Sequence, residues 1–350
     1  MSYVSVSASK SYTVEIAPDL LKDIGSRAAS IHPAVKAAVI SDSNVWPLYG
    51  QTVVESMEKA GFEVIHFVFN AGEASKNSNT YLEILNFLAS SGMTRSDILI
   101  ALGGGVVGDM TGFVAATYLR GIAFIQVPTT LLAMVDSSVG GKTAIDLPTG
   151  KNLVGAFYQP DLVLCDINTL STLPESIFCD GCAEVIKYGI LYDEKLFSHL
   201  EAYGLLFDRL SVVTRCVEWK RDVVAEDEFD RGSRQKLNLG HTIGHGIETS
   251  SRFSISHGQA VSTGIAIIAR AAQSMGICSS NTCQRITNLL TRFKLPITTD
   301  YTASQLFNCA LSDKKRAGST VNLIIPKEIG NCIISPTAIN QLETIIEAGL

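Results

Sequence analysis

The stretch 97-DILIALGGGVVGD-109 places a short apolar run directly before three consecutive glycines. The run is typical of a buried strand, and Gly103, Gly105 and Gly108 have the G-x-G-x-x-G spacing of a turn that leads into a helix. Glycines at these positions let backbone approach a pyrophosphate, and the N-terminus of the following helix favours its charge. The stretch predicts a strand–turn–helix unit with a dinucleotide at the turn, although such glycine turns are common on their own.

The sequence around this stretch repeats the same alternation of predicted strands and helices. Three further apolar runs are predicted strands, at 35–41, 62–69 and 124–130. Segments 53–61 and 79–92 between them have the apolar spacing of helices. Strands that alternate with helices predict right-handed crossovers and a parallel sheet covered on both faces.

The second half of the chain has a different pattern. Long helical periodicities dominate it from about residue 175, as in 183–204 and 257–276. We therefore expect an α/β fold in which residues 1–174 form a dinucleotide-binding parallel-sheet domain and residues 175–350 form a mostly α-helical domain. The cleft between two such domains is the expected active site.

Composition excludes several classes of protein. The 350 residues are 46% apolar and 18% charged, which suits buried parallel strands, and the net charge of −6 gives no reason to expect a nucleic-acid partner. The first residues lack the basic and apolar regions of a signal peptide. No run of about 18 apolar residues is present to span a membrane. A cytoplasmic protein is expected.

The eight cysteines are scattered along the chain. Only Cys179 and Cys182 have a spacing typical of metal ligands or redox pairs, and a structural zinc site would need a second such pair. Reduced, buried cysteines are the expected state.

Polar residues follow the predicted strands of the first half. Asp42 ends the first strand, where a carboxylate could bind a ribose, and Glu73 and Lys76 follow the next one. Asp42 and Glu73 could equally be ordinary turn residues. Further on, glycines and threonines surround Lys142 and Lys151. Lysines in such small, apolar surroundings are typical of a cradle for phosphate or carboxylate groups.

Two histidines four residues apart, His241 and His245, lie between glycines in 238-NLGHTIGHGIE-248. Thr242 stands where a zinc protease would have its glutamate, so that chemistry is excluded. If the segment is helical, five polar residues share one face: Arg234, Asn238, His241, His245 and Glu248. Histidine, asparagine and glycine are poor helix formers, which favours a functional stripe over a solvated face.

A catalytic zinc site with an open position needs about three protein ligands. His257 is the remaining histidine able to join the pair, and Glu184 is the best carboxylate, one turn before Lys187 on the same predicted helix face. Spacing alone leaves open whether His241 and His245 are both ligands.

Taken together, these motifs resemble the 3-dehydroquinate synthases of the sugar-phosphate cyclase superfamily. Nine pieces occur in order across most of the chain: GEASK, GGGVVGD, YLRG, PTTLLAMVDSSVGGKT, GKN, AEVIKYG, RQKLNLGHTIGH, SHG and SDKK. Each is weak alone, whereas the ordered set is very specific. The resemblance implies a lyase that requires NAD and zinc or cobalt, a Rossmann-like N-terminal domain, a helical C-terminal domain and a homodimer.

The resemblance also implies a role for each matching residue. It makes Glu184, His241 and His257 the metal ligands and turns His245 toward the substrate. The implied substrate contacts are Asp136, Lys142, Asn152, Lys187, Lys220, Arg234, Asn238, and either Lys314 or Lys315, with Arg120 reaching the phosphate in the neighbouring subunit. The implied NAD contacts are Asp42, Glu73, Lys76, Gly104, Gly105, Asp109, Thr129, Thr130, Lys142, Lys151, Thr169 and Thr172.

The implied reaction is the second step of the shikimate pathway, toward chorismate and the aromatic amino acids. The substrate, 3-deoxy-D-arabino-heptulosonate 7-phosphate, would be oxidised transiently, lose phosphate, be reduced again and close its carbocycle by an aldol reaction. The cations listed above suit its carboxylate and phosphate, because charge-assisted hydrogen bonds are strong. A metal would lower the pKa of the hydroxyl being oxidised, and His245 could relay the proton.

Three alternatives share parts of this pattern. A metal-dependent polyol dehydrogenase would need NAD and a metal, but not the lysine and arginine side chains that suit an anionic substrate. Another sugar-phosphate cyclase would not need groups that bind a carboxylate. A dinucleotide-binding regulator without activity would not need an intact ligand set.

Overall fold

The computed structural model describes residues 1–33, 35–251, 254–314 and 319–350, without the side chains of 310–314. It contains two compact units. The α/β unit consists of Met1–Leu173 and Arg209–Phe229, and the helical unit of Pro174–Asp208 and Asp230–Leu350. The expected fold class, a parallel-sheet part followed by a mostly helical part, is confirmed.

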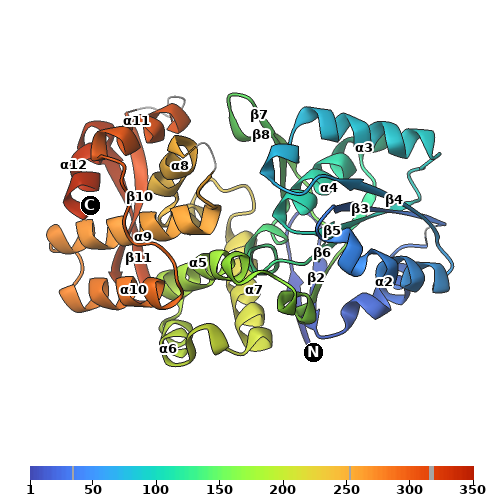
Figure 1. Ribbon diagram of the computed structural model, residues 1–350, viewed down its shortest axis with the longest axis horizontal. Coiled ribbons are helices and arrows are strands. Elements are labelled where there is room, and N and C mark those ends of the chain that lie inside the picture. Colours follow the sequence, from blue (N-terminus) through green and yellow to red (C-terminus); the bar gives the residue numbers. More distant parts are fainter. Residues whose placement is uncertain (34, 252–253, 315–318) are drawn as a thin grey trace. The chain divides into compact units, whose positions relative to one another are not determined.

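A seven-stranded sheet organises the described residues of the α/β unit (Figure 1). Its strands, in spatial order, are β1 (Ser2–Val6), β2 (Tyr12–Ala17), β9 (Leu162–Asp166), β6 (Ala123–Pro128), β5 (Ile98–Gly103), β3 (Lys36–Asp42) and β4 (Glu63–Phe69). Every pairing is parallel except that of β1 with β2. The chain passes from β4 across β3 to β5, so a topological switch point lies between β3 and β5, where open α/β sheets bind ligands.

Helices cover both faces of this sheet because successive strand residues point to opposite sides. Val39 packs in one apolar core and its neighbour Ile40 in the other, and both are fully buried. The first core also contains side chains of the helices on that face, α1 (Ile24–Ile31) and α2 (Trp46–Lys59). The second contains those of α3 (Ser78–Ser90) and α4 (Gly105–Thr117).

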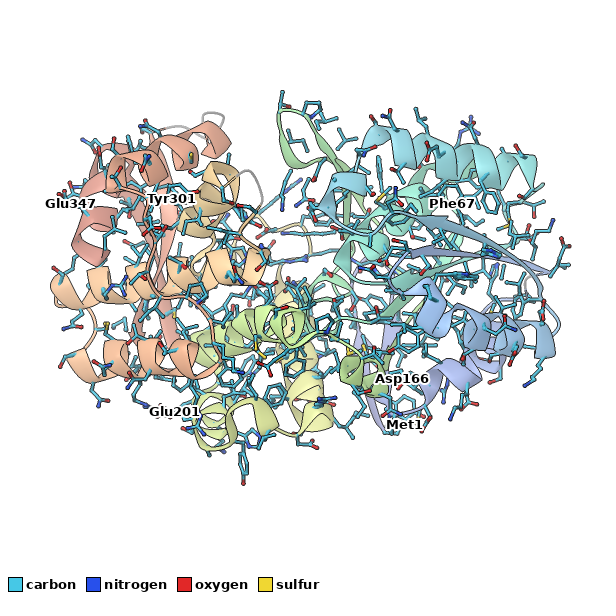
Figure 2. All side chains as sticks on the ribbon, in the orientation of Figure 1. Met1, Phe67, Asp166, Glu201, Tyr301 and Glu347 are labelled. Atoms are coloured by element: carbon cyan, nitrogen blue, oxygen red, sulfur yellow. The ribbon has the colours of Figure 1, made fainter. Side chains whose placement is uncertain are left out.

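The four predicted strands correspond to β3, β4, β5 and β6, and the two predicted helices to α2 and α3. Sequence analysis did not predict β1, β2 and β9, nor the hairpin of β7 (Lys142–Leu147) and β8 (Gly150–Phe157). Asp166, labelled in Figure 2, ends β9. It accepts backbone hydrogen bonds from Asp19 and Asn168 at 3.0 Å each. This carboxylate anchors the loop after β2 to the sheet.

One helix from the second half of the sequence belongs to the α/β unit. Helix α7 (Arg209–Glu226) contacts β1 and β2 through a buried apolar side that includes Val213, Cys216 and Val217. The division of the chain therefore differs from the expected one. The first boundary between the units, after Leu173, is one residue from the expected one. Residues 209–229, however, belong to the α/β unit and not to the helical unit.

The helical unit is built around α9 (His257–Ser274), whose middle is almost entirely buried. Helix α9 contacts α5 (Glu175–Tyr192), α8 (His241–Ser250), α10 (Ser280–Arg292), α12 (Ile339–Gly349) and the hairpin strand β10 (Thr320–Glu328). This unit also contains α6 (Glu194–Tyr203), α11 (Ala303–Lys314) and β11 (Asn331–Ala338), which pairs with β10. Among the described residues, no helix combines the length and apolar character required to cross a membrane.

Candidate functional site

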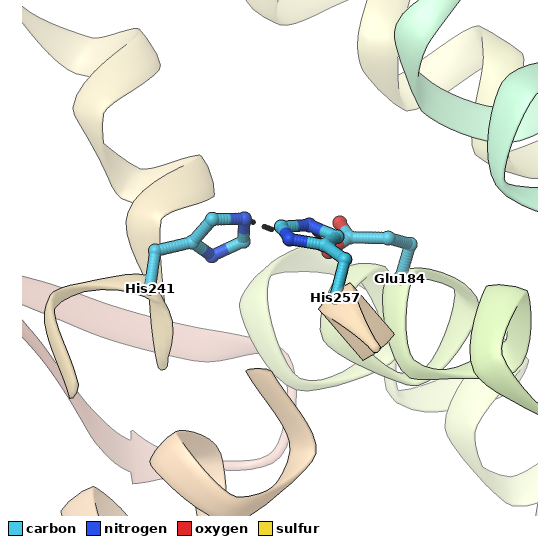
Figure 3. A group of neighbouring side chains, drawn as sticks. All are labelled: Glu184, His241 and His257. Atoms are coloured by element: carbon cyan, nitrogen blue, oxygen red, sulfur yellow. Dashed lines mark ion pairs between the residues drawn. The ribbon is translucent and has the colours of Figure 1, made fainter. Parts of the chain in front are cut away.

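Three side chains from three helices converge in the helical unit (Figure 3). Glu184 is fully buried in the middle of α5, while His241 and His257 are the first residues of α8 and α9. The Glu184 Oε1 atom lies 3.6 Å from His241 Nε2 and 3.5 Å from His257 Nε2. The structure thus brings together the three residues that the resemblance implies as metal ligands.

Glycines explain how His241 reaches α9. Gly240 has a positive φ of 78°, and a Cβ there would lie 2.6 Å from Ile265 Cγ1. A Cβ on Gly264 of α9 would overlap the carbonyl oxygen of Gly240. Only glycine permits this close approach of the two backbones, which accounts for glycine at positions 240 and 264.

Each histidine is held by a second partner through its Nδ1 atom. His241 Nδ1 lies 3.1 Å from the carbonyl oxygen of Leu239, and His257 Nδ1 lies 3.3 Å from Glu248 Oε1. A carbonyl can only accept a hydrogen bond, so Nδ1 of His241 carries the proton and Nε2 keeps its lone pair. Such outer partners are typical of histidines that ligate metals.

The electrostatics of Glu184, His241 and His257, called the trio from here on, favour a bound cation. Burial, together with the nearby Lys187, lowers the pKa of His241 to about 3, so this imidazole is neutral. Burial alone would lower the pKa of His257, but hydrogen bonds with Glu184 and Glu248 raise it to about 10. Two buried carboxylates therefore hold a positive charge at His257 when no metal is bound.

The donor set fits zinc or cobalt. Two imidazole nitrogens and a carboxylate oxygen lie within 4.8 Å of one another. Tetrahedral ligands about 2.0–2.2 Å from zinc are separated by about 3.3 Å, close to the Nε2–Oε1 distances here. Three protein ligands leave a fourth position open for a substrate oxygen.

A second group of possible ligands shares His257 and contains His245 and Glu248. In this second group, Glu248 contacts the Nδ1 atom of His257, whereas Glu184 of the first group contacts the Nε2 atom of the same ring. The ring of His245 lies 5.5 Å from that of His241 and 6.3 Å from that of His257. His245 is therefore beside the trio, one helical turn along α8.

The prediction of one continuous polar helix face is wrong. Arg234 and Asn238 lie on a separate 3₁₀ segment, Ser233–Asn238, and α8 begins only after Gly240. The positive φ of Gly240 interrupts the helix, so the five polar residues do not form one stripe. Arg234 is nevertheless 1% exposed.

Lys187 lies next to the trio on α5. Lys187 is 1% exposed and forms an ion pair with Glu184, which lies one helical turn earlier on α5. This contact agrees with the prediction that the two residues share one helix face. Lys314 ends α11, but its side chain and all of Lys315 lie outside the described residues.

The glycine turn in the α/β unit has the geometry of a dinucleotide site. Helix α4 begins at Gly105, and its N-cap, Gly104, offers no side chain, so the first backbone N–H groups are open to a ligand. A Cβ on Gly108 would lie 2.5 Å from Gln126 Oε1, which explains this third glycine. Next to the turn, the buried Thr129 hydroxyl has no hydrogen-bond partner among the described residues.

Two predicted cofactor residues, Asp42 and Thr130, lie at or just after the ends of strands β3 and β6. Asp42 ends β3 beside β5, and its Oδ1 accepts hydrogen bonds from the backbone of Asn44 at 2.8 Å and of Val45 at 3.0 Å. Thr130 accepts a hydrogen bond from Ala133 N at 3.2 Å. Asp42 therefore lies at the topological switch point of the sheet.

Lys76 lies at the centre of a cluster of residues that are predicted to contact NAD or the substrate. Its Nζ atom lies 2.5 Å from Asp109 Oδ2 and 2.6 Å from Asn152 Oδ1, and Lys151 pairs with Glu73 at 3.3 Å. Burial alone would lower the pKa of Lys76, but the carboxylates of Asp109 and Glu73 raise it. The lysine thus stays charged in a nearly closed environment.

Asp136 and Lys220 form another pair within the α/β unit. Lys220 Nζ on α7 lies 2.5 Å from Asp136 Oδ1, although the two residues are 84 positions apart. Asp136 lies in a π-helical turn, Ala133–Ser137, a geometry frequent at functional sites. The return of α7 to the sheet makes this contact possible.

The other predicted residues are more dispersed. Lys142 is exposed at the start of β7, and Arg120 is exposed in a loop where it and Leu119 have positive φ angles of 69° and 51°. Non-glycine residues with positive φ cost conformational energy, which is often retained at functional sites. Thr169 and Thr172 line a turn contacted by the Tyr49 hydroxyl, 2.5 Å from Thr172 Oγ1.

Sequence analysis assigned no separate role to Glu248, which the structure shows to be a partner of His257. The available signal was its place seven residues after His241, two helical turns along. Cys179 and Cys182 are buried and free of disulfide bonds on α5.

Comparisons with known proteins agree with this geometry. Residues 66–180 match the model of the 3-dehydroquinate synthase N-terminal family, and residues 181–316 that of the 3-dehydroquinate synthase C-terminal family. A 3-dehydroquinate synthase of Clostridium acetobutylicum is 42% identical over 93% of each chain. One of Enterococcus faecalis is 44% identical over 93% of this chain and 92% of its own.

Several solved structures share this fold. A 2-deoxy-scyllo-inosose synthase, in complex with carbaglucose-6-phosphate, NAD⁺ and Co²⁺, has a TM-score of 0.88 at 25% identity over 100% of both chains. A 2-epi-5-epi-valiolone synthase from Streptomyces hygroscopicus, with NAD⁺ and Zn²⁺ bound, has a TM-score of 0.88 at 24% identity over 98% of both. A glycerol dehydrogenase from Schizosaccharomyces pombe is more distant, with a TM-score of 0.65 at 18% identity over 96% of this chain and 88% of its own.

Proposed function

The chain belongs to the 3-dehydroquinate synthase family, and from that premise we propose that it converts 3-deoxy-D-arabino-heptulosonate 7-phosphate to 3-dehydroquinate and phosphate. The observation that carries the proposal is the convergence of Glu184, His241 and His257 with their outer partners. The glycine turn of α4 supplies the complementary site for NAD.

The cofactors define the class of chemistry. A zinc or cobalt ion would act as a Lewis acid on adjacent substrate hydroxyls, and NAD would accept a hydride from one of them and return it later. The proposed reaction would then release phosphate and close the carbocycle by an intramolecular aldol reaction, with no net oxidation of the substrate.

The residues of the helical unit have separate tasks. We propose that Glu184, His241 and His257 hold the metal, while His245 beside them moves a proton to or from a substrate oxygen. Lys187 and Arg234 are each 1% exposed, and with Asn238 and Lys314 they would bind the polar and anionic groups of the substrate.

The residues of the α/β unit divide between cofactor and substrate. Asp136, Lys142, Asn152 and Lys220 are the proposed substrate contacts. Lys142 is also a proposed NAD contact, together with ten other residues: Asp42, Glu73, Lys76, Gly104, Gly105, Asp109, Thr129, Thr130, Lys151 and Thr172. Thr169 is also proposed, although its hydroxyl is buried and donates to the Asp166 carbonyl oxygen at 2.8 Å.

We also propose a homodimer in which Arg120 of the partner subunit binds the substrate phosphate. In support, Arg120 is exposed, and the adjacent apolar Leu119 is 40% exposed in a strained loop. A cytoplasmic location is proposed because the described residues form no disulfide bond, as is typical of a reducing compartment.

The experiment that tests the proposed function is phosphate release from the heptulosonate phosphate, with and without NAD and with and without a chelator. We expect release that needs both NAD and metal, with no net accumulation of NADH. NADH formation from glycerol without phosphate release would instead identify a polyol dehydrogenase. Phosphate release only from glucose 6-phosphate or a heptulose 7-phosphate would identify a different cyclase.

A further inference from the structure

The N-terminus of α9 is capped by a residue of another helix. Ser256 occupies the N-cap position, but its side chain makes no capping hydrogen bond to α9. Instead, Asp180 of α5 accepts a hydrogen bond from Gln259 N at 3.0 Å, and the Ser256 hydroxyl also donates to it. A carboxylate here satisfies an open N–H group and interacts favourably with the helix dipole.

The backbones of the two helices are in direct contact at the same point. A Cβ on Gly258 would overlap the carbonyl oxygen of Asp180. Glycine at 258 therefore lets the first turn of α9 lie against α5, close enough for the Asp180 carboxylate to reach Ser256 and Gln259.

This contact joins two of the proposed metal ligands. Asp180 lies one helical turn before Glu184 on α5, and His257 lies between Ser256 and Gly258 at the start of α9. The first turn of a helix is where fraying begins, so the position of His257 depends on how this turn is held. The Nε2 atom of His257 must stay near its present distance of 3.5 Å from Glu184 Oε1 if the two residues are to bind the same ion.

We propose that Asp180 is a positioning residue of the metal centre: by capping α9 from α5, it fixes the separation of His257 and Glu184. The inference rests on the proposed function, since it assumes that the trio binds metal. Asp180 belongs to neither group of candidate metal ligands among the described residues, and its Oδ1 atom accepts the hydrogen bonds of Ser256 and Gln259.

A matched control separates positioning from general stabilisation. Asp193 caps α6 in the same unit, where it accepts a hydrogen bond from Leu196 N at 3.0 Å. Helix α6 carries none of the trio. Asp193→Ala therefore removes a comparable cap without disturbing a proposed ligand.

The test measures Co²⁺ affinity by competition with a chelator, and the visible spectrum of bound Co²⁺, for wild type and three variants. We expect Asp180→Ala to bind Co²⁺ about 10–100-fold more weakly, as is usual when support of a ligand is lost, with an altered spectrum. Asp180→Asn should recover most of the affinity, because its amide oxygen can still accept from Gln259 N. Asp193→Ala should bind Co²⁺ as wild type does.

Hydrogen exchange in the metal-free proteins provides a second measurement. We expect faster exchange of the amides of residues 257–262 in Asp180→Ala than in Asp193→Ala. If Asp180→Ala does not fold, Ser256→Ala, which removes one of the two bonds to Asp180, should show a smaller loss of affinity in the same direction.

Wild-type affinity and spectrum in a folded Asp180→Ala protein would overturn this inference alone, and so would an equal loss of affinity in Asp193→Ala. A wild-type protein that does not bind Co²⁺ or Zn²⁺ would overturn the proposed metal centre, and this inference with it.

Discussion

The contact between Glu248 and His257 predicts that Glu248→Gln weakens metal binding without unfolding the protein. Glu248 is 3% exposed, and its Oε1 atom lies 3.3 Å from His257 Nδ1. A carboxylate at this position orients the imidazole and makes its opposite nitrogen, Nε2, a better ligand. Glutamine keeps the shape of the side chain and removes the charge.

The size of the effect follows from the kind of contact. Loss of an outer carboxylate partner usually lowers metal affinity by about 10–100-fold, or about 1.4–2.8 kcal/mol of binding free energy. We expect Glu248→Gln near the lower end of this range, because its amide oxygen can still accept a hydrogen bond from Nδ1. Glu248→Ala should lie near the upper end, because it also leaves a cavity.

The assay is competition for Zn²⁺ with a chromophoric chelator, supported by circular dichroism of the metal-free proteins. Glu201→Gln is the control, since Glu201 pairs with Arg285 at 2.7 Å in the same unit and contacts none of the trio. The reasoning is refuted if folded Glu248→Gln binds Zn²⁺ as tightly as wild type, or if Glu201→Gln loses as much affinity.

Three further variants test other parts of the account. Lys76→Met should weaken NAD binding by at least about tenfold, because charge-assisted bonds to Asp109 and Asn152 are lost; unchanged affinity in a titration would contradict the cofactor assignment. Arg120→Ala should raise the KM for the phosphate substrate about tenfold or more with NAD affinity unchanged, and steady-state kinetics with an unaltered KM would argue against its role. Gly264→Ala should lower the free energy of unfolding by about 1–3 kcal/mol, since its Cβ overlaps the Gly240 carbonyl oxygen; denaturant unfolding at wild-type stability would disprove that close approach.

The central strands could be predicted because they are buried on both faces and read as continuous apolar runs. Strand β5, for example, is buried at every residue. The hairpin of β7 and β8 gives no such signal, because β8 is mostly exposed and its sequence contains polar and glycine residues. Hairpin β10–β11 lies within a half of the chain dominated by helical periodicity, which masked its alternating burial.

Local periodicity also could not reveal where the chain reverses its course. Helix α7 has an ordinary helical pattern, and its return to the sheet depends on contacts with β1 and β2, which are distant in sequence. For the same reason the Asp136–Lys220 pair was not predicted as a contact.

The residue types of the candidate metal centre were predictable, whereas its assembly was not. Spacing identified His241, His245, His257 and Glu184 as candidates, but helical geometry alone extended the polar stripe through Gly240. The left-handed conformation of that glycine, and its packing against α9, decide where α8 begins. The outer partners Glu248 and Leu239 then determine which nitrogen of each histidine faces Glu184.

The most direct test of the central claim compares the metal content and phosphate release of His257→Ala and His245→Ala, purified in parallel with wild type. We predict that His257→Ala loses both the metal and the activity while its NAD binding is retained. His245→Ala should keep the metal and lose most of the activity, because His245 lies beside the trio and not within it. Full phosphate release by metal-free His257→Ala would contradict the account.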